Sequence, residues 1–319
     1  MTTIPMTNTE EHNPTTNTSP TSRRYTVSHR MRYVYSAPVT LDDLVVRLQP
    51  RTSYEQHLIK FDMTCYPQPT RHTHCLDLHG NIRHWFWFDV SHDSLEITTH
   101  ATVDCLCDNP FDYIVVDEGV LRLPATYAQP VGAATEHYRH RTKPHPEVNK
   151  IARQIMRDCD GQTPSFLATL ASYIHANIRY IVRNEGEPYT PTQTLERGEG
   201  ACRDSAVLFI DACRSVGLAA RFVSGYAWDA IDPSHRELHA WAEVYLPGAG
   251  WRGYDPTTGL AVADRHIAVA ASPTASYCAP ITGTFTGPRV RSTLSYKIDM
   301  QMQELPATEQ EPGTTFIWP

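Results

Sequence analysis

The stretch from residue 198 to residue 206 reads Gly198-Glu199-Gly200-Ala201-Cys202-Arg203-Asp204-Ser205-Ala206. It decides the fold because two glycines lead into a cysteine that opens an apolar pattern of helical spacing, which continues to Val216. Gly217 is placed to end that helix with a positive φ. We therefore predict a helix over residues 202–216 with Cys202 in its first turn.

A cysteine at the start of a helix has distinctive chemistry. The first backbone N–H groups of a helix lack partners inside it, and the helix dipole places partial positive charge there. A thiol in that position ionises more easily, and the thiolate is the nucleophile. Gly200 lets a substrate backbone approach, and the N–H of Cys202 is placed to face a developing oxyanion. We predict that Cys202 is a catalytic nucleophile.

The downstream sequence supplies a base for this thiol and a carboxylate to orient the base. His239 begins the predicted strand His239–Leu246, and Asp255 ends the next, Trp251–Asp255. The turn between them makes a hairpin, so His239 and Asp255 are expected roughly opposite each other, with Cβ atoms ~5 Å apart. We predict that Cys202, His239 and Asp255 form a catalytic triad.

Helices and further strands are predicted around this hairpin. Apolar spacing indicates helices over Glu147–Asp158 and Ser165–Val182, and a strand over Ala219–Tyr226. Together these elements predict an α+β core over residues 147–288, in which the nucleophile helix packs on an antiparallel sheet. Residues 289–319 are expected to form a C-terminal strand and a polar tail.

The first third of the chain has a different pattern. Residues 1–24 are rich in Thr, Asn and Pro without apolar periodicity, and we predict that they are disordered. Residues 25–125 carry short aromatic and β-branched runs separated by turn residues, which predict an antiparallel β-sandwich-like domain. Prolines and weak apolar patterning predict a linker over residues 126–146. The runs are Tyr33–Tyr35, Leu44–Leu48, Trp85–Phe88 and Leu95–Thr99.

The sequence resembles bacterial transglutaminase-like proteins of the papain-like superfamily. Four segments of the core carry the resemblance: residues 198–206, 212–226, 239–245 and 250–257. Residues 33–39, 47–50 and 77–81 resemble the β-rich domain that often precedes such a core. The resemblance implies that Cys202 is the nucleophile, His239 the base and Asp255 its orienting residue.

Other residues near the triad are open to two interpretations. Tyr180, Tyr226 and Trp241 either contact substrate or pack in the core, and Gly200 gives a substrate room to approach. Asp204 supports the helix start through its dipole. One segment departs from the family pattern: Ser272-Pro273-Thr274-Ala275 stands where relatives carry a Gly-Arg-Asp-Tyr-like sequence. We expect substrate selection to differ if this segment borders the cleft.

Composition excludes several classes of function. The chain has a formal net charge of −7 and no dense Lys/Arg cluster, so we expect no nucleic-acid partner. No stretch approaches ~20 consecutive apolar residues, so we expect no membrane span. The start lacks the apolar region of a secretory signal, and we interpret the eight cysteines as reduced thiols of a cytoplasmic protein.

We expect no metal and no organic cofactor. His72 and His74 share one face of an alternating strand, while Cys75 faces the other way, and His79 lies beyond the strand. Cys105 and Cys107 do not have the spacing of a zinc knuckle. No acidic loop of the calcium-binding kind is present.

These residues predict acyl transfer on a peptide or protein amide through a thioester. Hydrolysis, as in a protease or amidase, is favoured over transamidation, in which an amine resolves the thioester. The alternative from another class is a catalytically silent module that binds a peptide or protein. Thiol reactivity distinguishes them, because a binding module has no need of an activated Cys202.

Overall fold

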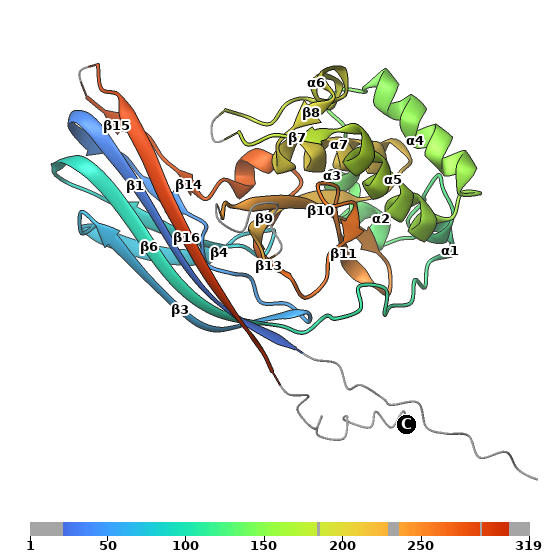
Figure 1. The fold of residues 1–319 in the computed structure, drawn as a ribbon, viewed down its shortest axis with the longest axis horizontal. Coiled ribbons are helices and arrows are strands. Elements are labelled where there is room, and N and C mark those ends of the chain that lie inside the picture. Colours follow the sequence, from blue (N-terminus) through green and yellow to red (C-terminus); the bar gives the residue numbers. More distant parts are fainter. Residues whose placement is uncertain (1–21, 184–185, 229–235, 288, 306–319) are drawn as a thin grey trace, which may run out of the picture.

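The computed structural model describes residues 22–183, 186–228, 236–287 and 289–305, and its elements are labelled in Figure 1. Most of the predicted disordered start and of the predicted polar tail lies outside these residues, but Arg23 and Arg24, which we predicted to be disordered, belong to the first strand because they pair with Cys105 and Asp104. The strands of the first third are β1 (Arg23–Leu41), β2 (Leu44–Val46), β3 (Gln56–Tyr66), β4 (Arg71–Leu76), β5 (Ile82–Trp87) and β6 (Ser91–Cys105). The helices are α1 (Glu118–Leu121), α2 (Val131–Ala134), α3 (Glu136–Arg139), α4 (Pro146–Asp158), α5 (Thr163–Asn177), α6 (Pro191–Arg197), α7 (Cys202–Ser215) and the 3-10 helix η1 (Ala275–Cys278). The later strands are β7 (Arg179–Tyr180), β8 (Glu199–Gly200), β9 (Ala220–Ala227), β10 (His239–Leu246), β11 (Gly250–Asp255), β12 (Leu260–Ala261), β13 (His266–Ser272), β14 (Ile281–Thr282), β15 (Phe285–Thr286) and β16 (Ser292–Glu304).

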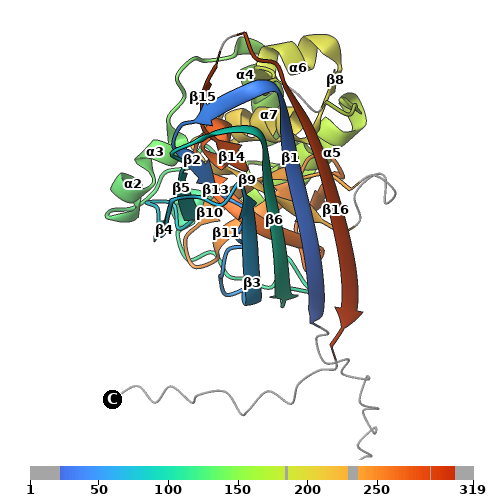
Figure 2. The ribbon, with the colours of Figure 1, turned by 90° about the vertical axis from the view of Figure 1, so that its left-hand side faces the viewer.

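The N-terminal sandwich, as we name it, consists of two antiparallel sheets. The larger has the order β15-β1-β6-β3 with β16 also paired to β1, and the smaller has the order β14-β2-β5-β4. Figure 2 shows β3, β6, β1 and β16 side by side. Side chains that alternate inward along β1 pack against the smaller sheet, as Met31 and Val39 do against Phe86. The predicted sandwich-like domain is confirmed.

The core domain contains a five-stranded antiparallel sheet of order β12-β11-β10-β9-β13. Helix α7 packs on this sheet through a face that includes Ala206, Phe209 and Cys213, against Ala242 and Val244 of β10. The opposite face of the sheet contacts the N-terminal sandwich, so β9 is buried along its whole length. The predicted α+β class, with the nucleophile helix on an antiparallel sheet, is confirmed (Figure 1).

The predicted helix over Ser165–Val182 is too long. Helix α5 ends at Asn177, and Arg179–Tyr180 forms a short strand parallel to Glu199–Gly200. The backbone N–H of Arg179 donates to the carbonyl of Gly198 at 2.8 Å, and that of Ile181 donates to the carbonyl of Gly200 at 3.0 Å. The apolar spacing continued past the helix because Ile178 is still buried in the core, but the backbone beyond it pairs with a neighbouring strand.

The predicted linker over residues 126–146 is part of the core domain. It contains α2 and α3, and the Tyr127 hydroxyl donates to the carbonyl of Tyr245 while it accepts the N–H of Ala219, both at 2.9 Å. The preceding segment also belongs there, because Val120 is fully buried in the helical core. The prolines therefore mark irregular chain that is packed, rather than a free connection.

The chain returns to the N-terminal sandwich before its end. Strands β14 and β15 pair with β2 and β1, so residues 281–286 leave the core domain earlier than the predicted boundary at residue 288. The predicted C-terminal strand is present as β16, which pairs with β1 from Arg23 to Tyr35. Among the described residues, none of the helices is both long enough and apolar enough to cross a membrane.

Candidate active site

The start of α7 places Cys202 at the first helical position, after Ala201 in extended conformation. The side chain of Asp204, 0% exposed, braces this turn. Its Oδ2 accepts the N–H of Ala201 at 2.8 Å, and its Oδ1 accepts the N–H of Tyr189 at 2.7 Å. The carboxylate thus satisfies a free N–H at the helix start and ties it to the preceding loop.

Gly200 is required by packing at this turn. A Cβ at Gly200 would lie 2.8 Å from the Cβ of Asp204, which is closer than such atoms approach. Gly200 is buried and does not line the cavity described below. The structure therefore gives this glycine a different role from the substrate approach that we expected: it lets Asp204 close over the turn before Cys202.

His239 and Asp255 lie together at the start of β10 and the end of β11. The Nε2 of His239 is 2.8 Å from the Oδ2 of Asp255, and both side chains are buried. The last paired residues of β10 and β11 at this end are Ala242 and Tyr254. If the same register continues, Asp255 lies opposite Trp241, and His239 is its diagonal neighbour two residues away on β10. The expected adjacency is present, but across the diagonal rather than directly opposite.

This geometry assigns the two ring nitrogens of His239 to different partners. Its Nε2 donates to Asp255, which leaves Nδ1 for the hydrogen bond with Cys202. Burial alone lowers the pKa of His239, but the Asp255 carboxylate and the bonds to Asp255 and Cys202 raise it well above its usual 6.5. Burial likewise opposes ionisation of Asp255, yet His239 and His266 hold the pKa of that carboxyl well below its usual range. The site therefore favours a charged His239 imidazolium beside the Asp255 carboxylate.

His266, at the start of β13, is a member of this group that the sequence analysis missed. Its Nε2 lies 3.3 Å from the same Oδ2 of Asp255, whose Oδ1 accepts the N–H of Thr257 at 2.9 Å. The ring of His266 also meets Trp241 edge-on at 5.1 Å between centroids. No spacing rule points to His266, because β13 reaches the site only by pairing with β9 on the far side of β10.

The three aromatic residues considered as substrate contacts occupy different places. Trp241 is 1% exposed, and its ring lies beside that of His239 at 6.3 Å between centroids, so it packs against His239 from within the sheet. Tyr226 is buried between the two domains, where its hydroxyl lies 3.1 Å from the Nδ1 of His29. Tyr180 is half-buried near Cys202, and burial, followed by the charge of Cys202, raises its pKa to about 12. Neither Trp241, Tyr226 nor Tyr180 lines the cavity.

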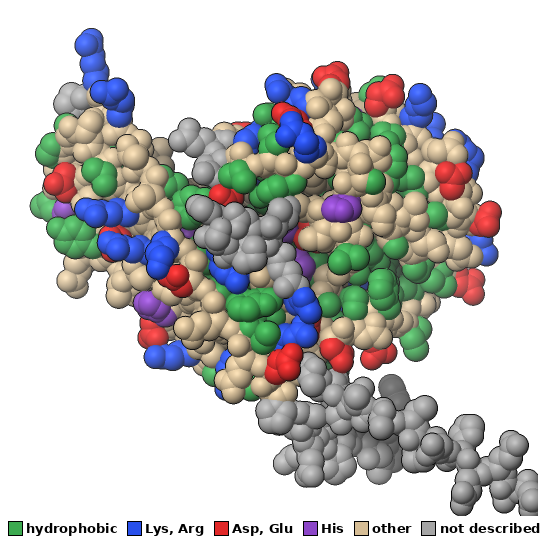
Figure 3. All heavy atoms as spheres, viewed as in Figure 1, with side chains coloured by type: hydrophobic (Ala, Val, Ile, Leu, Met, Phe, Trp, Pro, Cys, Tyr) green, Lys and Arg blue, Asp and Glu red, His purple; other side chains and the backbone are tan. Residues whose placement is uncertain are grey.

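A cavity of about 670 Å³ opens between the two domains, and Cys202 and His239 lie in its wall. Figure 1 shows β1 and β16 on one side of it and α7 and β10 on the other, and Figure 3 shows the surface notched between the two domains. The segment Ser272–Ala275, which departs from the family pattern, borders the cavity through Ala275. The next residue, Ser276, also lines it. Most of the sandwich side is apolar: Met31, Tyr33, Tyr35, Leu41, Leu44, Leu95 and Leu294.

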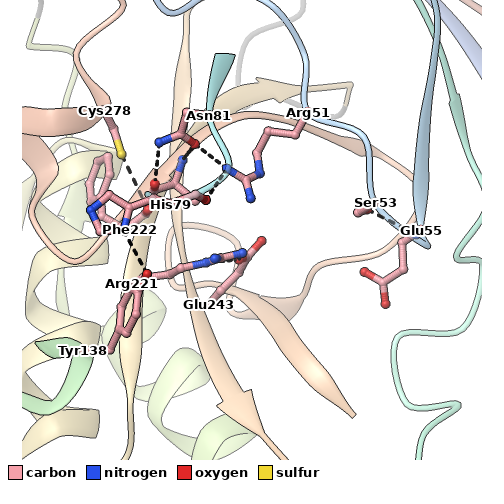
Figure 4. Close-up of polar contacts among 11 residues, drawn as sticks. Arg51, Ser53, Glu55, His79, Asn81, Tyr138, Arg221, Phe222, Glu243 and Cys278 are labelled. Carbon is pink, nitrogen blue, oxygen red and sulfur yellow. Dashed lines mark hydrogen bonds and ion pairs between the residues drawn. The ribbon is translucent and has the colours of Figure 1, made fainter. Parts of the chain in front are cut away.

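Polar contacts join the N-terminal sandwich to the core domain (Figure 4). Asn81 is fully buried, and its amide exchanges two hydrogen bonds of 2.8 Å with the backbone of Ala271 in β13. Arg51 donates to Asn81 and, at 3.1 Å, to the carbonyl of His79. The Nδ1 of His79 lies 2.9 Å from the Tyr138 hydroxyl of α3. Residues 77–81, which the sequence analysis matched to the family pattern, therefore form a loop that docks the N-terminal sandwich on the core domain.

Comparison with known proteins agrees with this architecture. The model of the transglutaminase-like superfamily matches residues 149–256, and that of the bacterial transglutaminase-like N-terminal region matches residues 25–104. Uncharacterized proteins of Mycobacterium bovis and Mycobacterium tuberculosis are each 30% identical over 302 residues, which cover 88% of this chain and 93% of theirs. A crystal structure from Cytophaga hutchinsonii, described as a candidate cysteine protease, has a TM-score of 0.65 at 18% identity and covers 89% of this chain and 91% of its own. The matched ranges coincide with the N-terminal sandwich and with the helices and hairpin that hold Cys202, His239 and Asp255, and the chain therefore belongs to the transglutaminase-like superfamily, with a bacterial transglutaminase-like N-terminal region before its core.

Proposed function

We propose that this protein is a cysteine-dependent hydrolase of peptide or amide bonds. One observation carries the proposal: Cys202 forms a hydrogen bond with His239, and the Nε2 of His239 lies 2.8 Å from the Oδ2 of the buried Asp255. Cys202 lies at the positive end of α7 and in the wall of a cavity. A nucleophile, a base and an orienting carboxylate in this order are the parts that acyl transfer needs. Membership of the transglutaminase-like superfamily supports cysteine-based catalysis in general.

Each step of the proposed reaction uses one of these groups. The Cys202 thiolate attacks the amide carbonyl carbon, and backbone N–H groups at the start of α7 stabilise the oxyanion. The imidazolium of His239 then donates its Nδ1 proton to the leaving nitrogen as the C–N bond breaks, which leaves a thioester. Water next attacks the thioester carbon and gives its proton to His239, and the thiolate leaves as the acid forms. Asp255 keeps the Nε2 proton in place throughout.

The cavity supports a peptide segment with an apolar side chain as the substrate. Its volume lies within the usual range of ligand sites, roughly 300–1,000 Å³. The side chains contributed by the N-terminal sandwich are mostly apolar, and they face Cys202 across the cavity. An apolar side chain beside the scissile amide would be buried against Met31 and Leu95, whereas a charged one would lose its hydration there.

Selective alkylation tests the nucleophile without requiring a known substrate. The native protein is treated with iodoacetamide at pH 6.5, and the modified cysteines are mapped by mass spectrometry. Burial raises the pKa of Cys65, Cys105 and Cys278 to about 12 and that of Cys107 to about 11. Those thiols are therefore protected, and the exposed Cys75 serves as an internal reference.

We expect Cys202 to be alkylated at least tenfold faster than Cys75, and His239→Ala to abolish this advantage while Cys75 is unaffected. Equal rates at the two cysteines in the wild type would contradict an activated nucleophile and favour the binding-module interpretation. The reaction type is then read from a peptide mixture incubated with and without a fluorescent primary amine. Cleaved peptides support hydrolysis, whereas amine-labelled peptides as the main product replace it with transamidation. Cys202→Ala is the control for both.

A further inference from the structure

Three histidines converge at the open edge of the N-terminal sandwich, away from the cavity. His72 and His74 lie on the edge strand β4, and His84 lies on β5, directly paired with His74. One ring nitrogen from each lies within 4.8 Å of the other two. The sequence analysis expected no metal because alternation along one strand brings together only two of these rings. The third comes from the neighbouring strand. Cys75 and His79, considered there, are not members of this group.

The ring nitrogens of this cluster are already directed toward one another. The Nε2 of His84 lies 3.0 Å from the Oε1 of Gln49, and because that oxygen only accepts, Nε2 carries the proton. The Nδ1 of His84 is therefore unprotonated, and it accepts a hydrogen bond of 3.1 Å from the Nε2 of His72. A histidine whose outer nitrogen donates to a fixed acceptor, while its inner nitrogen is unprotonated, has the arrangement that metal-binding histidines adopt, and an ion here would take the place of the proton between the two rings.

The surroundings hold two of the rings in place. His72 stacks on Phe86 at 4.6 Å between centroids with an interplanar angle of 9°, and His84 contacts Phe61 of β3. His74 is exposed, so it is free to turn toward the other two. Nitrogens bound to one tetrahedral ion at ~2.0–2.1 Å lie about 3.4 Å apart. The pair His72 and His84 already approaches that separation, and His74 needs only a side-chain rotation.

We propose that His72, His74 and His84 form a binding site for a divalent transition-metal ion that prefers imidazole ligands, with Zn²⁺ as the best match and water completing its coordination. Three neutral imidazoles suit Zn²⁺ and related ions, whereas Mg²⁺ and Ca²⁺ require oxygen ligands. None of the three histidines lines the catalytic cavity, so this site is independent of the proposed function.

An ion here would join the edge strand β4 to β5, on either side of the docking loop that carries Asn81. We infer a stabilising role for the ion rather than a catalytic one.

A second group of possible metal ligands must be eliminated before zinc binding by His72, His74 and His84 can be measured. His239, Asp255 and His266 also lie within 4.8 Å of one another, and Cys202 bonds to His239. Zinc titrations are therefore performed on the full chain carrying Cys202→Ser and His266→Ala, by calorimetry at pH 7.5. His74→Ala and His72→Ala are added to this background in turn. Both rings are exposed, so these substitutions leave the fold intact. His100→Ala, an exposed histidine on β6, is the matched control.

We expect one equivalent of Zn²⁺ in the background protein and in the His100→Ala control, and at least tenfold weaker binding in the His74→Ala and His72→Ala proteins. Co²⁺ bound at the same site should give the visible absorption of a nitrogen site without a thiolate charge-transfer band. Absence of binding in the background protein, equal affinity in His74→Ala, or a thiolate band would each overturn the proposal.

Discussion

Replacement of Asp255 by asparagine tests the chemistry of the site most directly. The Oδ1 of Asp255 accepts the N–H of Thr257 at 2.9 Å, so the amide oxygen of the new side chain must take that position. Its NH₂ group then points at His239 and His266, where the carboxylate oxygen had accepted two hydrogen bonds. The shape is conserved, but a donor now faces the Nε2 of His239. That nitrogen must accept, and the ring proton moves to Nδ1, which faces Cys202.

The magnitude follows from the loss of a buried charge partner. His239 is 8% exposed and Asp255 is 0% exposed, so solvent screens their interaction weakly. Loss of one member of such a pair costs about 3–5 kcal/mol. At about 1.36 kcal/mol per factor of ten, this corresponds to a roughly 10²- to 10⁴-fold loss of the thiolate–imidazolium form, and of any rate that depends on it.

The assay is the alkylation rate of Cys202 at pH 6.5, with the rate at Cys75 as reference. Asp255→Asn should lower the rate at Cys202 at least 100-fold and leave Cys75 unchanged. Asp211→Asn is the matched control, because it removes a carboxylate from α7, the helix that carries Cys202, and this carboxylate pairs with Arg141 at 2.7 Å. If Cys202 in the folded Asp255→Asn protein is alkylated at a rate within a factor of ten of the wild-type rate, the assignment of the ring protons in the site is wrong.

Three further predictions concern stability and are measured by urea denaturation. Burial lowers the pKa of His29 to about 4, so only the unfolded state binds a proton at His29 as the pH falls from 6.5 toward 4. The free energy of unfolding should therefore decrease by about 3 kcal/mol by pH 4, and His29→Gln should reduce this dependence of stability on pH. An equal slope in the variant would contradict this. Gly200→Ala should destabilise the protein by about 1–3 kcal/mol through the contact with Asp204, and an unchanged midpoint would show that the turn relaxes without cost. Asn81→Leu leaves the buried N–H and carbonyl of Ala271 unpaired and should cost about 2–6 kcal/mol, whereas a neutral result would mean that the docking loop is not structural.

The elements that the sequence predicted well are those with a strong local signal. Helix α7 begins at Cys202 and is followed by Gly217 with φ of +88°, as its apolar spacing and glycine indicated. The hairpin of β10 and β11 also lies where its turn residues predicted. By contrast, the helix predicted over Ser165–Val182 was too long and the segment over residues 126–146 is packed. Apolar periodicity and proline content do not determine which other part of the chain a segment forms hydrogen bonds with or packs against.

The sequence by itself determined the order of the chemistry: a cysteine that opens a helix, then a histidine and an aspartate on neighbouring strands. Short-range patterns suffice for this, because each residue's place on its own element follows from local spacing. Only the tertiary structure decided that His266 shares Asp255, that β16 closes the N-terminal sandwich, and that His84 joins His72 and His74. Each of these contacts joins strands that are brought together by sheet pairing, and pairing depends on packing across the whole fold rather than on the residues beside each strand.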